Sequence, residues 1–203
     1  MDILTTEHWS LLSTRTLGYQ EMFSRATIFV AILSGTVVAL ALLAQATNFR
    51  RETLWFALML ISLTLFIGLA TFVRSVAINY EDARWVTGMN LLRRAYLQIV
   101  PELEPFFVTG HEPDADGRSL GEGSPQCLGN LVNSLTTTSG VVAALNSLLA
   151  GSLASDLGAL SGEGAGLNAA LGVGVSLLSA ALHVRHAARF RQSHAPFVSR
   201  KNV

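Results

Sequence analysis

The chain has 203 residues, of which 50% are hydrophobic and only 14% are charged, and its mean hydropathy of +0.43 exceeds that of a typical water-soluble domain. A formal net charge of zero gives no signal for nucleic-acid binding, and the single cysteine, Cys127, excludes an internal disulfide. This composition predicts an integral membrane protein whose main partner is the lipid bilayer.

Residues 1–25 predict a short amphipathic helix that leads into the first apolar block. Four large side chains recur on it at helical spacing, namely Trp9, Leu12, Tyr19 and Phe23. Two placements are open for this helix. It lies on the bilayer surface with aromatic rings at headgroup depth, or it packs against other helices outside the membrane.

Residues 26–73 contain two charge-free apolar blocks, Ala26 to Ala46 and Leu54 to Val73. About 20 helical residues span the roughly 30 Å hydrocarbon core of a bilayer, so the blocks predict a transmembrane hairpin. The Ala44 to Ala46 run has the form of a signal-peptide cleavage site, but the apolar stretch is too long and its flank is not basic. We therefore interpret the first block as a membrane span.

Residues 74–101 predict a cytoplasmic continuation of the second span, because no proline interrupts the chain before Pro101. A stripe of large side chains alternates steps of four and three, which is the spacing of a helix-packing surface. The stripe is expected to pack against the N-terminal helix of the same chain or against a second copy, which makes a homo-oligomer a possible assembly. Its members are Trp85, Met89, Leu92, Tyr96 and Ile99.

Residues 102–135 are rich in proline, glycine and acids and predict a flexible linker. His111, Glu112, Asp114 and Asp116 resemble a divalent-metal cluster, but their spacing does not match an EF-hand loop. No metal site and no cofactor are predicted.

Residues 136–183 predict a second transmembrane hairpin, with helices over Thr136 to Ser155 and about Gly164 to His183. Small residues recur at every fourth position, which lets membrane helices approach closely. The buried polar side chains Asn146 and Asn168 predict hydrogen bonds between helices or, alternatively, the lining of a polar path. The expected small-residue packing positions are Gly151, Gly162, Gly166 and Gly174.

Residues 184–203 predict a basic cytoplasmic tail. His183 at the end of the last span, with His186 and His194 in the tail, is expected to form part of an interfacial cluster and not a metal site. With four spans, 12 basic residues fall on one side of the membrane and 2 fall on the other. The positive-inside rule then places both termini in the cytoplasm. Thirteen of the 14 basic residues are arginine, a bias typical of high-GC bacteria, so the predicted location is a bacterial inner membrane.

The predicted fold class is all-α, an integral membrane bundle of four transmembrane helices with cytoplasmic helical extensions. No catalytic constellation stands out, so the chain is not expected to be an enzyme. Two functions remain open: helix-mediated self-assembly or docking of a protein partner, and a pore or transport path through the small-residue helices. No Asp, Glu, Lys or His lies near the centre of a span, which argues against a proton-coupled carrier.

Two runs of sequence, YQEMFSRATIFVAILSGTVVALALLAQAT and NYEDARWVTGMNLLRRAYLQIVPELEPFFVTG, resemble a family of small bacterial multi-pass membrane proteins without an assigned function. The resemblance covers about the first 110 residues and implies no site residues. In layout, the chain is also similar to two-helix membrane effectors of bacterial nucleotide-signalling defence systems.

Overall fold

The computed structural model describes residues 2–48, 51–107 and 136–193, and all regular structure in these ranges is helical. This finding confirms the all-α prediction, and four of the helices are long and apolar enough to cross a membrane. The elements in chain order are α1 (Asp2–Thr47), α2 (Arg51–Ile99), the 3-10 helix η1 (Pro101–Phe106), α5 (Thr138–Leu160) and α6 (Ala165–Ser193).

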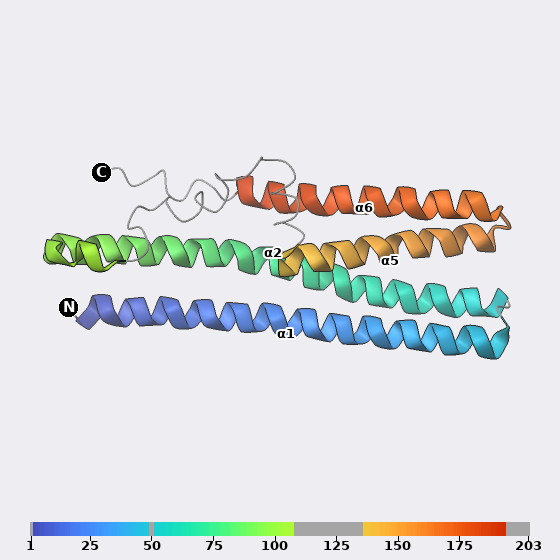
Figure 1. Cartoon of the computed structure of the whole chain (residues 1–203), viewed down its shortest axis with the longest axis horizontal. Coiled ribbons are helices and arrows are strands. Elements are labelled where there is room, and N and C mark those ends of the chain that lie inside the picture. The colour runs from blue at the N-terminus through green and yellow to red at the C-terminus, as the bar shows by residue number, and fades with distance from the viewer. Residues whose placement is uncertain (1, 49–50, 108–135, 194–203) are drawn as a thin grey trace.

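The helices α1 and α2 are much longer than a bilayer requires. They contain 46 and 49 residues, and at 1.5 Å per residue they measure about 69 and 74 Å, against a hydrocarbon core of about 30 Å. Figure 1 shows both helices running well beyond the ends of α5 and α6. We call the part outside the predicted spans, residues 2–25 of α1 and 74–99 of α2, the two-helix extension.

The predicted N-terminal amphipathic helix is not a separate element, because it forms the first half of α1. No proline occurs between Asp2 and Thr47. Helix propensity therefore carries the chain from the extension into the apolar block without a break. The predicted continuation of the second span is likewise present, since α2 runs to Ile99 and η1 begins at Pro101.

The turns between helices occur where the backbone changes handedness. Asn48 follows α1 with a φ of 49°, a conformation that asparagine tolerates better than most residues. Gly162 separates α5 from α6 with a φ of 80°, and glycine adopts this conformation without a Cβ clash. At the other end of α5, the Thr137 hydroxyl accepts a hydrogen bond from the Gly140 amide at 3.1 Å and caps the helix.

The second hairpin is longer than the sequence predicts. The helix α5 continues past Ser155 to Leu160, and α6 continues past His183 to Ser193. The first half of the predicted tail, 184–203, is therefore helical. The apolar pattern ends near His183, but the following alanines and arginines are strong helix formers, so the helix outlasts the hydrophobic block.

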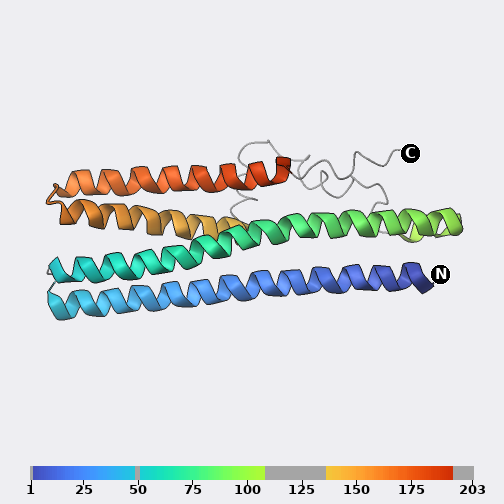
Figure 2. The ribbon, with the colours of Figure 1, turned by 180° about the vertical axis from the view of Figure 1, so that it is seen from behind.

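The four long helices form a single layer in the order α1, α2, α5, α6, in which α1 packs on α2, α2 on α5, and α5 on α6 (Figures 1 and 2). Direct contact between α2 and α6 is slight. The main apolar core lies where α1, α2 and α5 meet, and it comprises Phe29, Ala57, Ile61, Phe72, Val76, Val142 and Leu149.

Candidate functional site

The two helices of the extension meet along a closely packed seam. Gly18 of α1 is buried, and a Cβ at this position would lie only 2.8 Å from a ring carbon of Trp85 on α2. Gly88 faces Leu11 in the same way, at 3.2 Å. Each glycine therefore accepts a large side chain from the other helix, which brings the two backbones together.

Most of the stripe predicted on α2 contributes to this seam. Met89 is only 4% exposed, Trp85 packs on Gly18, and the Tyr96 hydroxyl donates to Thr5 Oγ1 at 3.4 Å. Leu92 is half-buried, whereas Ile99, at the end of the helix, is 54% exposed. The contact with the N-terminal helix foreseen for this stripe is present at Trp85 and Tyr96.

Three of the four members of the predicted stripe on α1 are exposed, since Trp9 is 63% exposed, Leu12 38% and Phe23 56%. Only the fourth, Tyr19, bonds to α2. The buried side of α1 lies about a third of a turn from the exposed members and includes Gly18 and Met22. Sequence reasoning missed this side because its members include glycine, histidine and arginine, so hydrophobicity alone does not mark it.

Ion pairs connect the two helices where the predicted spans end. Arg74 donates to both carboxylate oxygens of Glu21, at 2.8 and 2.9 Å, and reaches Glu81 at 3.2 Å. Arg25 donates to the same Glu21 carboxylate at 2.8 Å. Hydrogen bonds from Arg74 and then from Arg25 lower the pKa of Glu21 from 4.5 to about 2. This cluster fixes the register of α1 against α2.

A second polar contact lies further along the extension. Arg15 donates from Nε to Asp82 Oδ1 at 2.6 Å, and the Tyr19 hydroxyl donates to Asp82 Oδ2 at 3.0 Å. The Arg15 guanidinium also lies 5.6 Å from the centre of the Tyr19 ring, a cation–π distance. The hydrogen bond to Asp82 is the main cause that raises the pKa of Arg15. The Glu21–Arg74 and Arg15–Asp82 contacts were not foreseen, because their partners are 53 and 67 residues apart in sequence.

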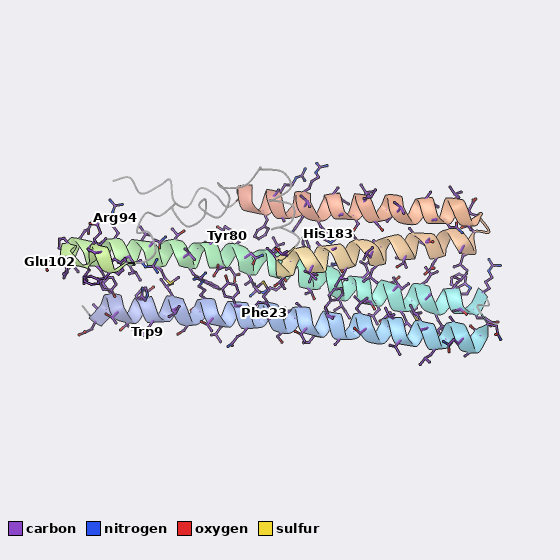
Figure 3. The ribbon with its side chains drawn as sticks, in the orientation of Figure 1. Trp9, Phe23, Tyr80, Arg94, Glu102 and His183 are labelled. Atoms are coloured by element: carbon purple, nitrogen blue, oxygen red, sulfur yellow. The ribbon has the colours of Figure 1, made fainter. Side chains whose placement is uncertain are left out.

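A pocket of about 380 Å³ opens near the far end of the extension. Its lining combines α1, α2 and η1, so it exists only because the two helices run side by side and Pro101 turns the chain back. Figure 3 shows Arg94 and Glu102 near this end. The lining residues are Thr5, His8, Trp9, Arg93, Tyr96, Phe106 and Phe107.

The two predicted intramembrane amides lie at different interfaces. Asn146 of α5 is fully buried against Gly68 of α2, and within the described part of the chain neither of its side-chain polar atoms has a hydrogen-bond partner. Asn168 of α6 packs on Gly158 of α5 and donates to the Glu163 carbonyl at 3.2 Å. The hydrogen bond of Asn168 belongs to the turn of the second hairpin, so the two amides do not line a common path within the chain.

Only one of the four predicted glycine positions packs against another helix of the chain. Gly151 is buried against α6, where a Cβ would lie 2.5 Å from the Gly172 carbonyl oxygen. Gly162 is the turn residue, while Gly166 and Gly174 face open space. The intrachain packing role is therefore wrong for these three glycines, and Gly158 and Gly172 make the contacts instead. The repeat of small residues at every fourth position predicts which residue types make the contact, but it does not predict which side of α6 faces α5.

The last residue of the predicted span and the start of the predicted tail also make unforeseen contacts with α2. His183 is 6% exposed, and its ring lies edge-on to Phe72 with the centroids 4.5 Å apart. Phe190 lies 5.8 Å from the Tyr80 ring in the same arrangement. The predicted linker motif around His111, with Cys127 and His194, lies outside the described residues.

No protein-family model, curated protein or solved structure matches the chain. The resemblance to small bacterial membrane proteins therefore remains a prediction. Any functional argument must come from the geometry of the chain itself.

Proposed function

We propose that the chain is a non-enzymatic integral membrane protein of the bacterial inner membrane that docks another helical protein, or a second copy of itself, through its two-helix extension. The proposal places four spans in the bilayer, and it places the extension and both termini in the cytoplasm. The observation that carries it is the exposed apolar flank of α1 formed by Trp9, Leu12 and Phe23.

The geometry supports a docking role because the seam between α1 and α2 is already complete. Trp85 and Met89 fill it, and the Glu21–Arg74 ion pair fixes its register. Leu12 and Phe23 lie outside this seam and are exposed in the described chain, whereas Trp9 also lines the pocket at the far end of the extension. Large apolar side chains grouped outside a bilayer are typical of an interaction surface. A helix laid along this flank would remove the apolar groups from water.

The orientation is supported by the distribution of basic residues around the layer. Arg51, one of the two basic residues assigned to the opposite side, donates to the Leu160 carbonyl at 3.0 Å. This contact ties the tips of the two hairpins together at one end. Arg15, Arg25 and Arg74 all belong to the other end, as the positive-inside rule requires of a cytoplasmic extension.

Replacement of the exposed flank tests the docking proposal. The variant Leu12→Ser with Phe23→Ser is expected to reduce self-association or partner capture at least tenfold, because it removes apolar contact area while leaving the seam intact. Light scattering of the protein in nanodiscs and crosslinking in membranes measure the two forms of assembly.

The matched control is Ile3→Ser with Leu17→Ser. Ile3 and Leu17 are 85% and 64% exposed on the same helix but lie on its other flank. An equal loss in both double variants, or no loss in either, would contradict a docking surface at Leu12 and Phe23.

The alternative function is a pore or transport path along α5 and α6. It requires Asn146 and Asn168 to share a path, whereas the two side chains lie at separate interfaces within the chain. A double replacement, Asn146→Leu with Asn168→Leu, is expected to leave the solute permeability of proteoliposomes unchanged. A clear fall in permeability would favour the pore over the docking proposal.

A further inference from the structure

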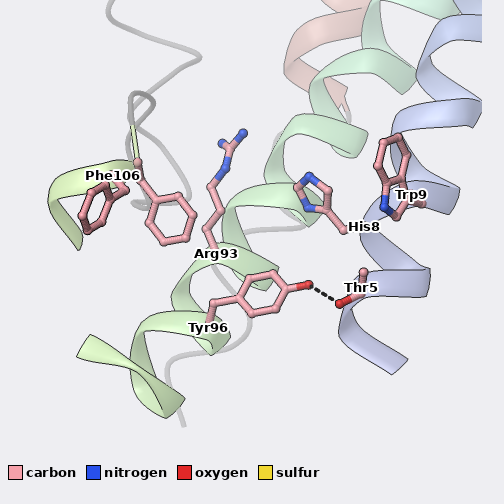
Figure 4. A pocket seen from close by; sticks show the side chains of 7 residues that line it. Thr5, His8, Trp9, Arg93, Tyr96 and Phe106 are labelled. Atoms are coloured by element: carbon pink, nitrogen blue, oxygen red, sulfur yellow. Dashed lines mark hydrogen bonds between the residues drawn. The ribbon is translucent and has the colours of Figure 1, made fainter. Parts of the chain in front are cut away.

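The pocket at the far end of the extension combines aromatic walls with one positive charge. Figure 4 shows Phe106 on one side and Trp9 on the other, with Arg93 and His8 between them and Tyr96 below. Its volume of about 380 Å³ lies within the range of small-molecule sites. The lining therefore has both the size and the mixture of groups that a small ligand requires.

The charge on Arg93 is not balanced by a carboxylate in the described chain. Its Nη1 donates to the Asn90 side-chain oxygen, a neutral amide, at 2.6 Å. By contrast, Arg15, Arg25 and Arg74 of the same extension each pair with an acid. A guanidinium carries five N–H donors in a planar fork that suits carboxylate and phosphate. Arg93 therefore retains donors for an anion.

His8 supplies a second polar atom that lacks a partner. Its Nδ1 is buried and has no hydrogen-bond partner among the residues that the structure describes. Buried polar atoms are nearly always paired with protein, water or a ligand. Because His8 lies beside Arg93 in the lining (Figure 4), one bound group could complete the hydrogen bonding of both side chains.

The aromatic walls of the pocket restrict the shape of the part of the ligand that lies beyond its anionic group. Trp9, Tyr96, Phe106 and Phe107 provide flat apolar surfaces, and Phe106 is 77% exposed. Aromatic rings alone would also suit an organic cation, but the guanidinium of Arg93 repels one. A planar ring fits between such walls by stacking.

We infer that this pocket binds a small planar aromatic anion, with the ring between the aromatic walls and the carboxylate or phosphate on Arg93. Trp9 belongs both to the docking flank and to the pocket lining, whereas Leu12 and Phe23, the two residues changed in the docking test, do not line the pocket. The structure thus gives the extension a ligand site at its far end in addition to its lateral surface.

Calorimetric titration of the full chain in phosphatidylcholine nanodiscs tests this assignment, with empty nanodiscs to subtract lipid partitioning. The probes are 1-naphthoate as the carboxylate, AMP as the phosphate, 1-naphthamide as a neutral analogue and 1-naphthylmethylammonium as a cation. At least one of the two anions is expected to bind at least tenfold more tightly than the amide and the ammonium. The comparison of 1-naphthoate with AMP identifies which anionic group the pocket prefers.

Arg93→Gln is expected to weaken binding of the anion at least tenfold, and Arg93→Lys to retain part of the affinity because it keeps the charge. The matched control is Arg94→Gln, since Arg94 is exposed and does not line the pocket. Circular dichroism verifies that each variant remains helical. If Arg93→Gln fails to fold, the comparison of probes on the unaltered chain still decides the question.

Three results would overturn the assignment: no saturable binding of either anion at 1 mM, equal or tighter binding of the amide or the ammonium, or an equal loss in Arg94→Gln. The docking double variant Leu12→Ser with Phe23→Ser is expected to bind the anion normally. Failure of the docking proposal therefore leaves the test of the anion site unaffected. Failure of the anion site likewise leaves the docking test unaffected.

Discussion

Two pairs of helices pack closely in this protein, but with different residues. One seam joins α1 and α2 in the extension, and the other joins α5 and α6. In the extension, Trp85 fills the space over Gly18 and ion pairs such as Glu21–Arg74 flank the contact. Between α5 and α6, the backbones of Gly151 and Gly172 approach directly, and the polar Ser176 and Asn168 lie beside them.

The proposed topology accounts for this difference through the solvent around each seam. In water, the burial of large apolar side chains stabilises a helix pair. In lipid there is no such force between helices, so close van der Waals contact and polar bonds must hold them together. The contrast between the two seams is the one that the proposed topology predicts, with the extension in water and the second hairpin in lipid.

The largest effect is expected at Gly151 of the second hairpin. Gly151→Leu places a side chain against the Gly172 carbonyl oxygen, which belongs to the backbone and cannot move aside. We expect a loss of about 2–3 kcal/mol, measured by denaturant unfolding in detergent.

Gly174→Leu is the control for that replacement, because the space around Gly174 is open. It is expected to leave stability nearly unchanged. Equal destabilisation of the two variants would show that α6 does not face α5 as described, and a changed oligomeric state of Gly174→Leu alone would assign this glycine to a contact between subunits.

A smaller loss is expected in the extension. Trp85→Ala empties the space over Gly18, and because Trp85 is only partly buried we expect about 2 kcal/mol of destabilisation. Trp9→Ala is the matched change at a residue that is 63% exposed, and it should cost less than about 0.5 kcal/mol. Thermal melting followed by circular dichroism compares the two, and a reversed order would contradict the seam.

The smallest effect is a dependence of the extension on pH. Because the pKa of Glu21 is lowered from 4.5 to about 2, its contribution is complete above about pH 4.5 and is lost as the pH falls toward 2. Glu21 and Arg74 are each about one-third exposed, so we expect less than about 1 kcal/mol.

Spin labels on the two helices measure their separation across this pH range. The helices of the unaltered chain are expected to separate only as the pH falls, whereas those of Glu21→Gln are expected to be separated at every pH. Glu7→Gln, at an exposed acid that forms no ion pair with α2 in the described chain, is the control. Identical pH profiles for the unaltered chain and Glu21→Gln would show that Glu21 does not stabilise the contact between the two helices.

Sequence patterns predicted the helices better than they predicted contacts. The four long helices follow from their apolar blocks, and Pro101 correctly marked the end of α2. The same patterns placed Gly166 and Gly174 in packing positions within the chain, where the structure leaves them open. In a segment rich in small residues every side of the helix looks alike, so periodicity alone does not select the contact side.

The sequence by itself determined which segments are helical, how long the apolar blocks are and where the basic residues fall, because each depends on neighbouring residues along the chain. Only the tertiary structure decided that Glu21 meets Arg74, that Trp85 covers Gly18 and that His8 and Arg93 line one pocket. These pairs are separated by more than 50 residues, and their contact depends on the register and rotation of whole helices. Register and rotation result from the sum of many packing contacts, which no local pattern specifies.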